Sequence, residues 1–346
     1  MSAARALEEL AALVAIDSRN PPRDAAAIAA HVEARLRGAF EIDVRDLGGG
    51  SICVHARRGA PRVLFNFHVD TVPAAPGWSA SPFALRVEGD RARGLGACDT
   101  KGAAAAMMAT ALETAGDLAL LFTTDEEAGQ AACVRDFIAR GLPYELVVVA
   151  EPTSCKAALA HRGIATATLT FRGRAGHASA ASIDSATHAL GRWMARALDA
   201  TSTAAQGPLL DARFNVGTIA GGVKANVVAA EATAKFGVRP PPAMDPSETV
   251  DALAALAPDA ELARAFLGPP LREHAAARAF AERFDLAVAP PVDFWTEAAL
   301  FAEAGYPAIV LGVGDIAQAH AANESVPIAD LERLTAIYAR MIRGAS

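Results

Sequence analysis

Histidine and carboxylate side chains stand directly after several apolar runs of this 346-residue sequence. His68 and Asp70 follow VLFNF, Glu126 and Glu127 lie just beyond LALLFTT, and Glu151 follows ELVVVA. Short apolar runs of this kind are typical of buried strands, and open α/β sheets bind ligands at the carboxyl ends of their strands. We therefore expect these side chains to meet at one edge of one sheet.

Three further polar residues extend this group. Asp315 and His320 come after the apolar run PAIVLGVG, and Asp99 lies in ACDTKGAAAA, at the expected start of a helix. Carboxylates gathered closely repel one another unless cations neutralise them. Histidine nitrogen and carboxylate oxygen, without thiolate, suit zinc in a catalytic site, with cobalt or manganese as substitutes. The pattern predicts a divalent metal site.

His68 and Asp70 are separated by one residue, so on a strand their side chains point to the same face. Asp70 can then accept the second ring N–H of His68 and fix the imidazole that binds the metal. Each residue also has a simpler explanation when it is taken alone. Asp99 can cap a helix, Glu126 and Glu127 can belong to a solvated loop, and His68 can be a hydrogen-bonded core histidine. A metal site is favoured because it explains all of them together.

The elements that position these residues alternate along the first half of the chain. Strands are expected at 63–67, 118–124 and 145–150, and helices at 101–115 and 133–142. Strands that alternate with helices indicate an α/β domain with a mainly parallel, mixed sheet.

From about residue 164 the pattern changes to half-exposed strands, such as IATATLTFRGR and AEATAKFGVRP, with two further helices. This pattern predicts a small α+β insertion with an antiparallel sheet. The α/β pattern returns near residue 272 and ends in an amphipathic helix. We therefore expect a catalytic domain at 1–163 and 272–346, interrupted by an inserted domain at 164–271.

Composition excludes several classes of protein. Hydrophobic residues make up 52% and charged residues 21% of the chain, and 32 basic against 39 acidic residues give a net charge of −7, which argues against a nucleic-acid partner. The opening MSAARALEELAALVAI reads as an amphipathic helix rather than a signal peptide, and the apolar runs are shorter than a bilayer requires. A cytoplasmic protein without a membrane partner is expected. The four cysteines show no CxxC pair, and no strand is followed by a phosphate-binding glycine motif.

Six ordered segments resemble the M20 metallopeptidases, a family of dizinc aminoacylases, deacetylases, desuccinylases and carboxypeptidases. The segments are HVDTVP, GLGACDTKGAAA, TTDEEAG, VAEPT, GRAGHAS and HAANESV. The resemblance extends from about residue 15 to the C-terminus. It implies a zinc-exopeptidase-like catalytic domain with two divalent metal ions per chain, interrupted by a lid or dimerisation domain.

The resemblance also implies a role for each metal-site residue. His68 and Glu151 match the ligands of one zinc, Glu127 and His320 match those of the other, and Asp99 matches the carboxylate that bridges them. Zinc is the expected metal, with cobalt as a substitute.

Catalytic and substrate residues follow from the same resemblance. Glu126 matches the general base that activates the attacking water, with Asp70 supporting the site. His177 matches a lid histidine that stabilises the oxyanion and, in dimeric relatives, reaches the site of the neighbouring subunit. Asn226 and Arg239 match positions that hold the carboxylate end of the substrate. A homodimer through the inserted domain is required if His177 works across subunits, whereas closure of the lid is the alternative by which it reaches the site of its own chain.

The sequence departs from the common pattern at DFWTEAAL, where Thr296 and Glu297 replace the Thr-Asp or Ser-Asp pair of many relatives. DFWTEA and GDIAQAH resemble the acetylcitrulline deacetylases, a branch close to acetylornithine deacetylase. This resemblance implies hydrolysis of an N-acetyl-L-amino acid, N-acetyl-L-citrulline above others, to acetate and the free amino acid in arginine biosynthesis, with Thr296 and Glu297 near the substrate. Acetylornithine, succinylated diamines and dipeptides are the alternative substrates, and an inactive scaffold of the same fold is the alternative outside enzymes.

Overall fold

The computed structural model describes residues 3–22, 25–180, 183–202 and 206–344. The chain divides into two compact units. Unit 1 comprises Met1–Leu159, Glu273–Pro290 and Thr296–Ser346, and unit 2 comprises Ala160–Arg272 and Pro291–Trp295. The insertion expected at 164–271 lies within the longer segment of unit 2, and its action as a lid or dimerisation domain stays a prediction.

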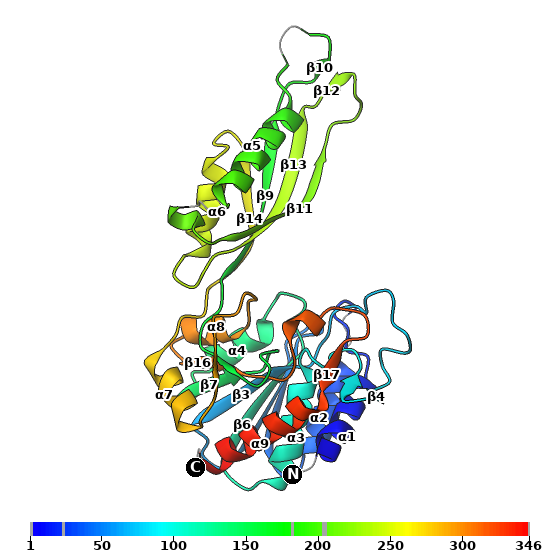
Figure 1. The fold of residues 1–346 in the computed structure, drawn as a ribbon, viewed down its shortest axis with the longest axis vertical. Coiled ribbons are helices and arrows are strands. Elements are labelled where there is room, and N and C mark those ends of the chain that lie inside the picture. Colours follow the sequence, from blue (N-terminus) through cyan, green and yellow to red (C-terminus); the bar gives the residue numbers. More distant parts are fainter. Residues whose placement is uncertain (1–2, 23–24, 181–182, 203–205, 345–346) are drawn as a thin grey trace. The chain divides into compact units, whose positions relative to one another are not determined.

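Unit 1 is built on a mixed sheet that has eight strands among the described residues, in the order β1-β2-β6-β3-β7-β16-β8-β15 (Figure 1). Its centre is parallel: β6 pairs with β3, β3 with β7, and β7 with β16. This finding confirms the α/β class and the mixed, largely parallel sheet. The strands are β1 (Glu41–Asp46), β2 (Ile52–Arg58), β3 (Val63–His68), β6 (Leu118–Thr123), β7 (Leu146–Val149), β8 (Ala157–Ala158), β15 (Val288–Ala289) and β16 (Ala308–Val310).

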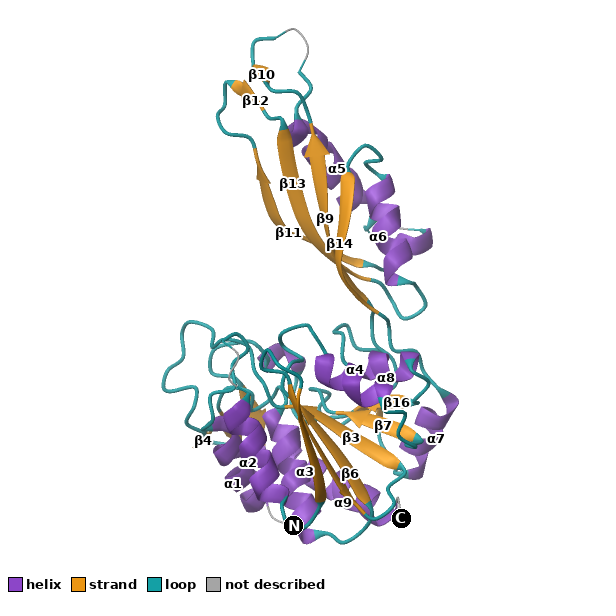
Figure 2. Ribbon diagram, turned by 180° about the vertical axis from the view of Figure 1, so that it is seen from behind, coloured by secondary structure: helices purple, strands orange, loops and turns teal. Residues whose placement is uncertain are grey.

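Helices cover both faces of this sheet (Figure 2). Three of them, α1, α3 and α9, pack together on one face, while α4 and α8 lie against the other. The rings of Phe65 and Tyr338, 5.7 Å apart, join β3 to α9. The helices are α1 (Ala3–Val14), α2 (Ala26–Leu36), α3 (Lys101–Glu113), α4 (Ala132–Ala139), α7 (Ala275–Arg283), α8 (Ala298–Glu303) and α9 (Ile328–Gly344), with a short 3-10 turn, η2 (Ile316–Gln318).

The three central strands are buried along their whole length, and this burial explains their continuous apolar sequences. They run parallel and end near His68, Thr123 and Val149. Residues that follow them therefore emerge at the same edge of the sheet. A second, three-stranded sheet joins β17 (Ser325–Pro327), β5 (Arg91–Arg93) and β4 (Arg86–Glu88), and it fixes the segment after His320 beside the loop before α3.

Unit 2 is an antiparallel sheet in the order β11-β13-β9-β14 with two helices packed on it. Buried and exposed residues alternate along β9 and β13, as expected for strands with one covered face. Trp193 of α5 is fully buried in this core, and its indole N–H donates to the Leu253 carbonyl at 2.9 Å. The elements are β9 (Ile164–Arg172), β10 (Gly176–His177), α5 (Ala186–Ala200), η1 (Gly207–Leu209), β11 (Arg213–Gly221), β12 (Val227–Val228), β13 (Glu231–Arg239), α6 (Pro246–Ala255) and β14 (Glu261–Gly268).

Several expected elements end earlier in the structure than the sequence predicts. The helix expected at 133–142 ends at Ala139, and the strand expected in PAIVLGVG covers only Ala308–Val310. Gly312 explains the early end of this strand, because its backbone lies so close to Glu151 that a Cβ would stand 2.4 Å from the Glu151 carbonyl oxygen. The chain there packs against the loop after β7 instead of continuing the ladder.

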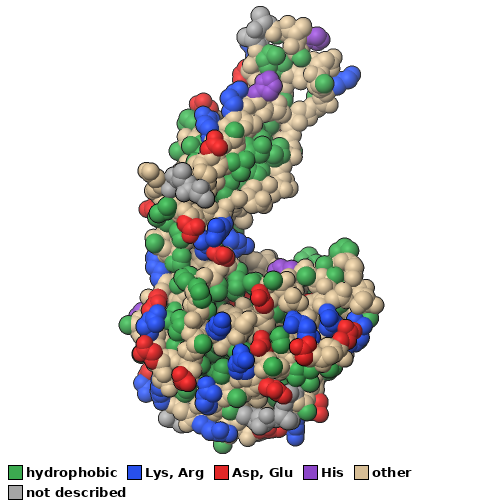
Figure 3. Space-filling model, viewed as in Figure 1, with side chains coloured by type: hydrophobic (Ala, Val, Ile, Leu, Met, Phe, Trp, Pro, Cys, Tyr) green, Lys and Arg blue, Asp and Glu red, His purple; other side chains and the backbone are tan. Residues whose placement is uncertain are grey.

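Acidic and basic side chains are interspersed on the face of unit 1 that Figure 3 shows. None of the helices within the described ranges combines the length with the apolar run that a bilayer crossing needs. The four cysteines are buried free thiols.

Candidate metal centre and active site

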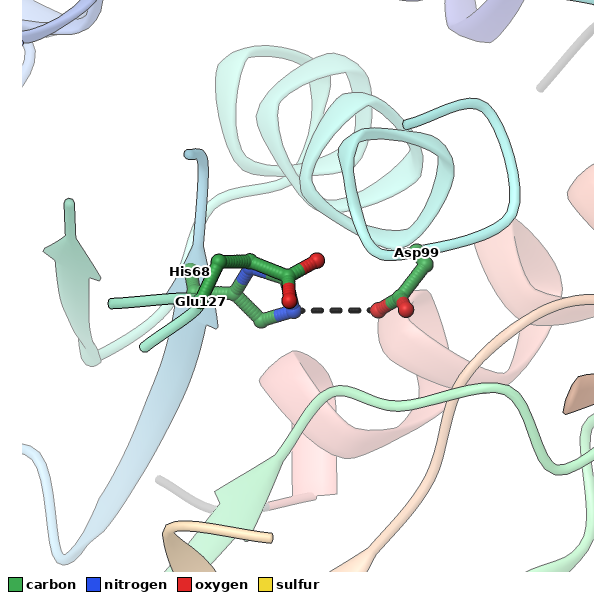
Figure 4. A group of neighbouring side chains, drawn as sticks. All are labelled: His68, Asp99 and Glu127. Carbon is green, nitrogen blue, oxygen red and sulfur yellow. Dashed lines mark hydrogen bonds and ion pairs between the residues drawn. The ribbon is translucent and has the colours of Figure 1, made fainter. Parts of the chain in front are cut away.

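His68, Asp99 and Glu127 come together in unit 1 with one potential ligand atom from each within 4.8 Å of the others (Figure 4). His68 is the last residue of β3, Asp99 lies just before α3, and Glu127 lies in the loop after β6. His68 and Asp99 are almost fully buried. The end of the parallel sheet therefore brings together residues that are far apart in the sequence.

Asp99 lies at the centre of two pairs of side chains. One carboxylate oxygen, Oδ1, is 3.1 Å from His68 Nε2, which is also 3.8 Å from Glu151 Oε1. The other oxygen, Oδ2, is 3.3 Å from His320 Nε2, and that nitrogen lies 3.1 Å from Glu127 Oε1. Each oxygen of Asp99 thus faces one histidine and its partner carboxylate. The structure brings together all five residues for which the sequence predicted metal binding.

Asp99 is not a helix cap. Helix α3 begins at Lys101, its N-cap residue is Thr100, and no side chain makes a capping hydrogen bond there. Although burial alone would raise the pKa of Asp99, the imidazoles of His320 and His68 hold it below its usual range. The capping explanation for Asp99 was therefore wrong.

The protein itself compensates the negative charge of the buried carboxylates at this site only poorly. Burial and the neighbouring carboxylates raise the pKa of Glu151 well above its usual value and that of Glu126 to about 8. Burial would lower the pKa of His68, but Asp70 and Asp99 beside it raise it well above its usual value. Clustered carboxylates and neutral imidazoles are the donor set that divalent cations take. The residues present therefore fit a metal centre.

Asp70 supports the site differently from the sequence expectation. His68 Nδ1 lies 3.3 Å from the backbone oxygen of Asp70 and 3.6 Å from its carboxylate, so the carboxylate is beyond hydrogen-bond distance. Asp70 Oδ2 instead accepts the backbone N–H of Glu127 at 3.0 Å and faces the Asn20 side-chain amide at 3.4 Å. Asp70 therefore holds the loop of Glu127 as well as adjoining His68.

Three buried or supporting residues of this region had no role assigned from the sequence. Asp125 Oδ2 accepts the N–H groups of Ala132 at 2.7 Å and Cys133 at 3.1 Å, and it closes the loop that carries Glu126 and Glu127. Asn20 and Glu324 are the others. The sequence carried no signal for these roles, because each depends on groups that only the folded loops bring close to the side chain. Asp315 does not join the cluster, since its carboxylate accepts the Ala317 N–H in η2 at 3.0 Å.

Thr296 and Glu297, expected near the substrate, are fully buried at the start of α8. Thr296 Oγ1 accepts the N–H of Ala298 at 3.2 Å, and Glu297 Oε2 faces Thr123 Oγ1 at 3.4 Å. Burial, together with the charge of Glu126, raises the pKa of Glu297 well above its usual value. Their contact with a substrate stays a prediction.

His177 and Asn226 lie together in unit 2. Strand β10 pairs with β12 so that His177 is opposite Val227, the residue after Asn226, and the Ala178 N–H donates to the Asn226 carbonyl at 3.1 Å. Both side chains are exposed, and His177 Nδ1 is 2.7 Å from Ser179 Oγ. These two residues form an exposed polar group at the short β10–β12 pair.

Arg239 is the last residue of β13, at the end of this strand that is farther along the chain from Asn226. The nine residues of β13 place its two ends about 26 Å apart at the usual rise per residue. It lines a cavity of about 250 Å³ in unit 2 together with Arg213 and Asn215. Burial lowers the pKa of Arg239, and no hydrogen bond or ion pair of its guanidinium is found in the described part of the chain. Arg239 is thus free to bind an anion, but at the end of unit 2 away from Asn226.

The fold and this site define a hydrolase with a metal-binding cluster at the carboxyl edge of a mixed α/β sheet. The family model for peptidase family M20/M25/M40 matches residues 64–344. The chain therefore belongs to this family, whose enzymes are metal-dependent.

Two proteins are similar to this chain in sequence, and one solved structure is similar to it in fold. The chain is 46% identical over 361 aligned positions to the N-acetyl-L-citrulline deacetylase of Xanthomonas campestris pv. campestris, covering 99% of this chain and 98% of that protein. It is 31% identical to the succinyl-diaminopimelate desuccinylase of Maricaulis maris, covering 84% and 83%. The M20 family metallo-carboxypeptidase Sso-CP2 from Sulfolobus solfataricus has a TM-score of 0.79 at 16% identity, covering 99% of both chains, and so shares the fold.

Proposed function

We propose that this protein removes the acetyl group from N-acetyl-L-citrulline and releases acetate and the free amino acid. The observation that carries the proposal is 46% identity, across nearly the whole chain, to a deacetylase of that specificity. The site supports the same chemistry, because His68, Glu151, Glu127 and His320 stand in pairs about Asp99. Citrulline as the product implies a place in arginine biosynthesis.

We assign metal binding to these five residues, which would hold the divalent ions, with Asp99 as the residue that faces both histidines. Bound divalent cations lower the pKa of water and polarise a carbonyl oxygen. Zinc fits nitrogen and oxygen donors without thiolate, and cobalt can replace it. Asp70 and Asp125 hold the loop that carries Glu127 through hydrogen bonds to its backbone, and so they would help to position this ligand.

Glu126 is the proposed general acid and base. It adjoins the ligand Glu127 in the loop after β6, where a carboxylate can take a proton from the attacking water and return it to the leaving amine. His177 is proposed to donate a hydrogen bond to the oxyanion, with Asn226 beside it. Arg239 is proposed to bind the substrate carboxylate, because a planar guanidinium without a protein partner suits bidentate capture.

Two finer statements belong to the proposal. A homodimer through unit 2 is inferred because His177 and Asn226 are exposed at the short β10–β12 pair of that unit. A cytoplasmic location is inferred because all four cysteines are free thiols, which suits a reducing compartment.

Acetate release from defined substrates tests the function. Protein loaded with zinc or cobalt is expected to hydrolyse N-acetyl-L-citrulline at least as fast as N-acetyl-L-ornithine, and to lose activity when a chelator removes the metal. A clear preference for a succinylated diamine or a dipeptide would contradict the assigned substrate while leaving the family unchanged. A stable protein that binds no metal would favour the inactive scaffold.

A further inference from the structure

Glu324 has no assigned role in the reaction, yet its carboxylate holds the loop that presents Asp99. Glu324 Oε1 accepts the backbone N–H groups of Cys98 at 2.8 Å and Asp99 at 3.0 Å, while Oε2 accepts that of Gly96 at 2.9 Å. The backbone oxygen of Glu324 also accepts the Gly94 N–H at 3.1 Å. Four hydrogen bonds thus join one residue to the short loop before α3.

The chemistry of this contact requires a carboxylate. An ionised carboxylate is purely an acceptor with two oxygens, so it can satisfy three converging N–H groups, whereas an amide would turn a donor toward one of them. Glu324 is only 2% exposed, and its charge lies near that of Asp99. Burying a second anion beside the first is costly unless hydrogen bonds compensate it. Three N–H donors provide that compensation and hold the loop rigidly.

The same short segment holds Asp99 from its other side. His320 lies four residues before Glu324, and its Nε2 is 3.3 Å from Asp99 Oδ2. The segment is itself anchored, because β17 starts at Ser325 and pairs with β5, and because the Arg91 guanidinium donates to Ser325 Oγ at 2.9 Å. One anchored segment therefore contacts both the side chain and the backbone of Asp99.

We propose that Glu324 is a positioning residue that fixes Asp99 for metal binding. It acts through the backbone of the loop that carries Asp99 and is not one of the proposed metal ligands. The inference rests on the metal centre proposed above and extends it, because it predicts that the affinity for metal depends on a carboxylate outside the ligand set. Residues that orient metal ligands typically contribute about 10-fold to 100-fold in metal affinity.

Metal titration of Glu324→Gln tests this role. Metal-free protein is titrated with Zn²⁺ against a chromophoric chelator, and the visible absorption bands of the Co²⁺-loaded protein report ligand geometry. Glu324→Gln keeps the size of the side chain, and we expect it to weaken binding of at least one ion by about 10-fold to 100-fold and to alter the Co²⁺ bands. Glu324→Asp keeps the charge on a shorter side chain. Its metal affinity is expected to lie between those of Glu324→Gln and the unmodified protein.

Glu9→Gln is the matched control, because Glu9 is also a buried carboxylate but accepts the Arg35 Nε–H at 2.8 Å, between α1 and α2. We expect it to lower the melting temperature without changing metal affinity or the Co²⁺ bands. The inference would be overturned if folded Glu324→Gln had the same metal affinity and the same Co²⁺ bands as the unmodified protein. If Glu324→Gln does not fold, equal metal affinities of Glu324→Asp and the unmodified protein would overturn it. Failure of the unmodified protein to bind two ions would instead overturn the proposed metal centre.

Discussion

At the scale of single residues, the side chains of the site are of two kinds. Some face the centre of the cluster, and others accept hydrogen bonds from the backbone that carries the first kind. Asp70 binds the backbone of Glu127, Asp125 closes the loop that carries it, and Glu324 binds the backbone before α3. Each of these carboxylates accepts backbone N–H groups, through one oxygen in Asp70 and Asp125 and through both oxygens in Glu324. The proposed ligands can therefore direct their own oxygens and nitrogens toward the metal ions.

Replacing Glu126 by Gln separates proton transfer from metal binding. Because an amide cannot take a proton from water, we expect kcat to fall by about 10²-fold to 10⁴-fold. Metal content measured by mass spectrometry is expected to stay at two ions per chain. Glu303→Gln, a change at the exposed end of α8, is the control and should leave kcat unaltered. A Glu126→Gln variant with near-normal kcat would remove the general base from the mechanism.

Arg239 provides a residue-scale test of substrate binding. Arg239→Ala removes the guanidinium that has no protein partner, and loss of a charge-assisted pair is expected to raise KM by about 10-fold or more. Arg239→Lys should recover only part of this loss, since an ammonium cannot bind a carboxylate through two parallel N–H groups. Arg196→Ala, on the exposed face of α5, is the charge-matched control. Steady-state kinetics with N-acetyl-L-citrulline measures both, and an unchanged KM in Arg239→Ala would contradict the assignment.

At the scale of elements, the metal-site geometry was predictable because it follows from strand ends. Parallel strands with continuous apolar sequences had to end at one edge, where His68 ends β3 and Glu151 follows β7. Glu127 follows the third strand, β6. Asp99 was expected at the start of a helix and His320 in the loop after a further apolar run, but their roles as ligands came from the motifs.

Substrate residues were less predictable, because their surroundings depend on tertiary packing. Nothing in DFWTEA indicates that Thr296 and Glu297 would be covered completely. Likewise, Asn226 and Arg239 were expected to hold the same carboxylate, yet Asn226 directly precedes β12, whereas Arg239 is the last residue of β13. The distance between two residues of one strand follows from their sequence numbers only when the strand is known to be continuous.

Strand β2 carries an element-scale prediction about pH. Burial and the nearby cation of Arg140 lower the pKa of His55 to about 4, and its Nε2 is 2.8 Å from the Tyr144 hydroxyl. Between pH 6.5 and 4 the unfolded chain binds a proton that the folded chain does not, so the free energy of unfolding falls as the pH falls. The loss between pH 7 and 4.5 is expected to be about 2 kcal/mol.

Urea unfolding at the two pH values measures this loss. His55→Gln keeps a polar side chain near Tyr144 but cannot be protonated, so its free energy of unfolding should fall by about 2 kcal/mol less than that of the unmodified protein between pH 7 and 4.5. His188→Gln, which changes an exposed histidine of unit 2, should fall as the unmodified protein does. An identical fall in all three proteins would show that His55 does not titrate in this range.

At the scale of the whole molecule, each unit has its own core, around Phe65 and Tyr338 in unit 1 and around Trp193 in unit 2. The proposed metal ligands all belong to unit 1. Metal bound only to the folded state stabilises it by about 3 kcal/mol when free metal is about 100 times the dissociation constant. Removing metal is therefore expected to speed hydrogen exchange in β3 and β6 and to leave β9 and β13 unchanged. Equal acceleration in both units, measured by mass spectrometry of peptides, would contradict a metal centre confined to unit 1.

The last prediction concerns assembly, because the proposed catalytic groups are divided between the units. Glu126 belongs to unit 1, and His177 is exposed in the β10–β12 pair of unit 2. If His177 serves the partner's site in a symmetric dimer, a mixture of His177→Ala and Glu126→Gln chains contains mixed dimers in which one site has both residues.

Equal amounts of the two inactive variants, unfolded and refolded together, should then recover about a quarter of the unmodified activity, since half of the dimers are mixed and each has one intact site. Each variant refolded alone is the control and should stay inactive. Light scattering must show the dimer in all samples. A dimeric mixture without recovered activity would place His177 at the site of its own chain, since no pairing of these variants could then restore a complete set of catalytic groups.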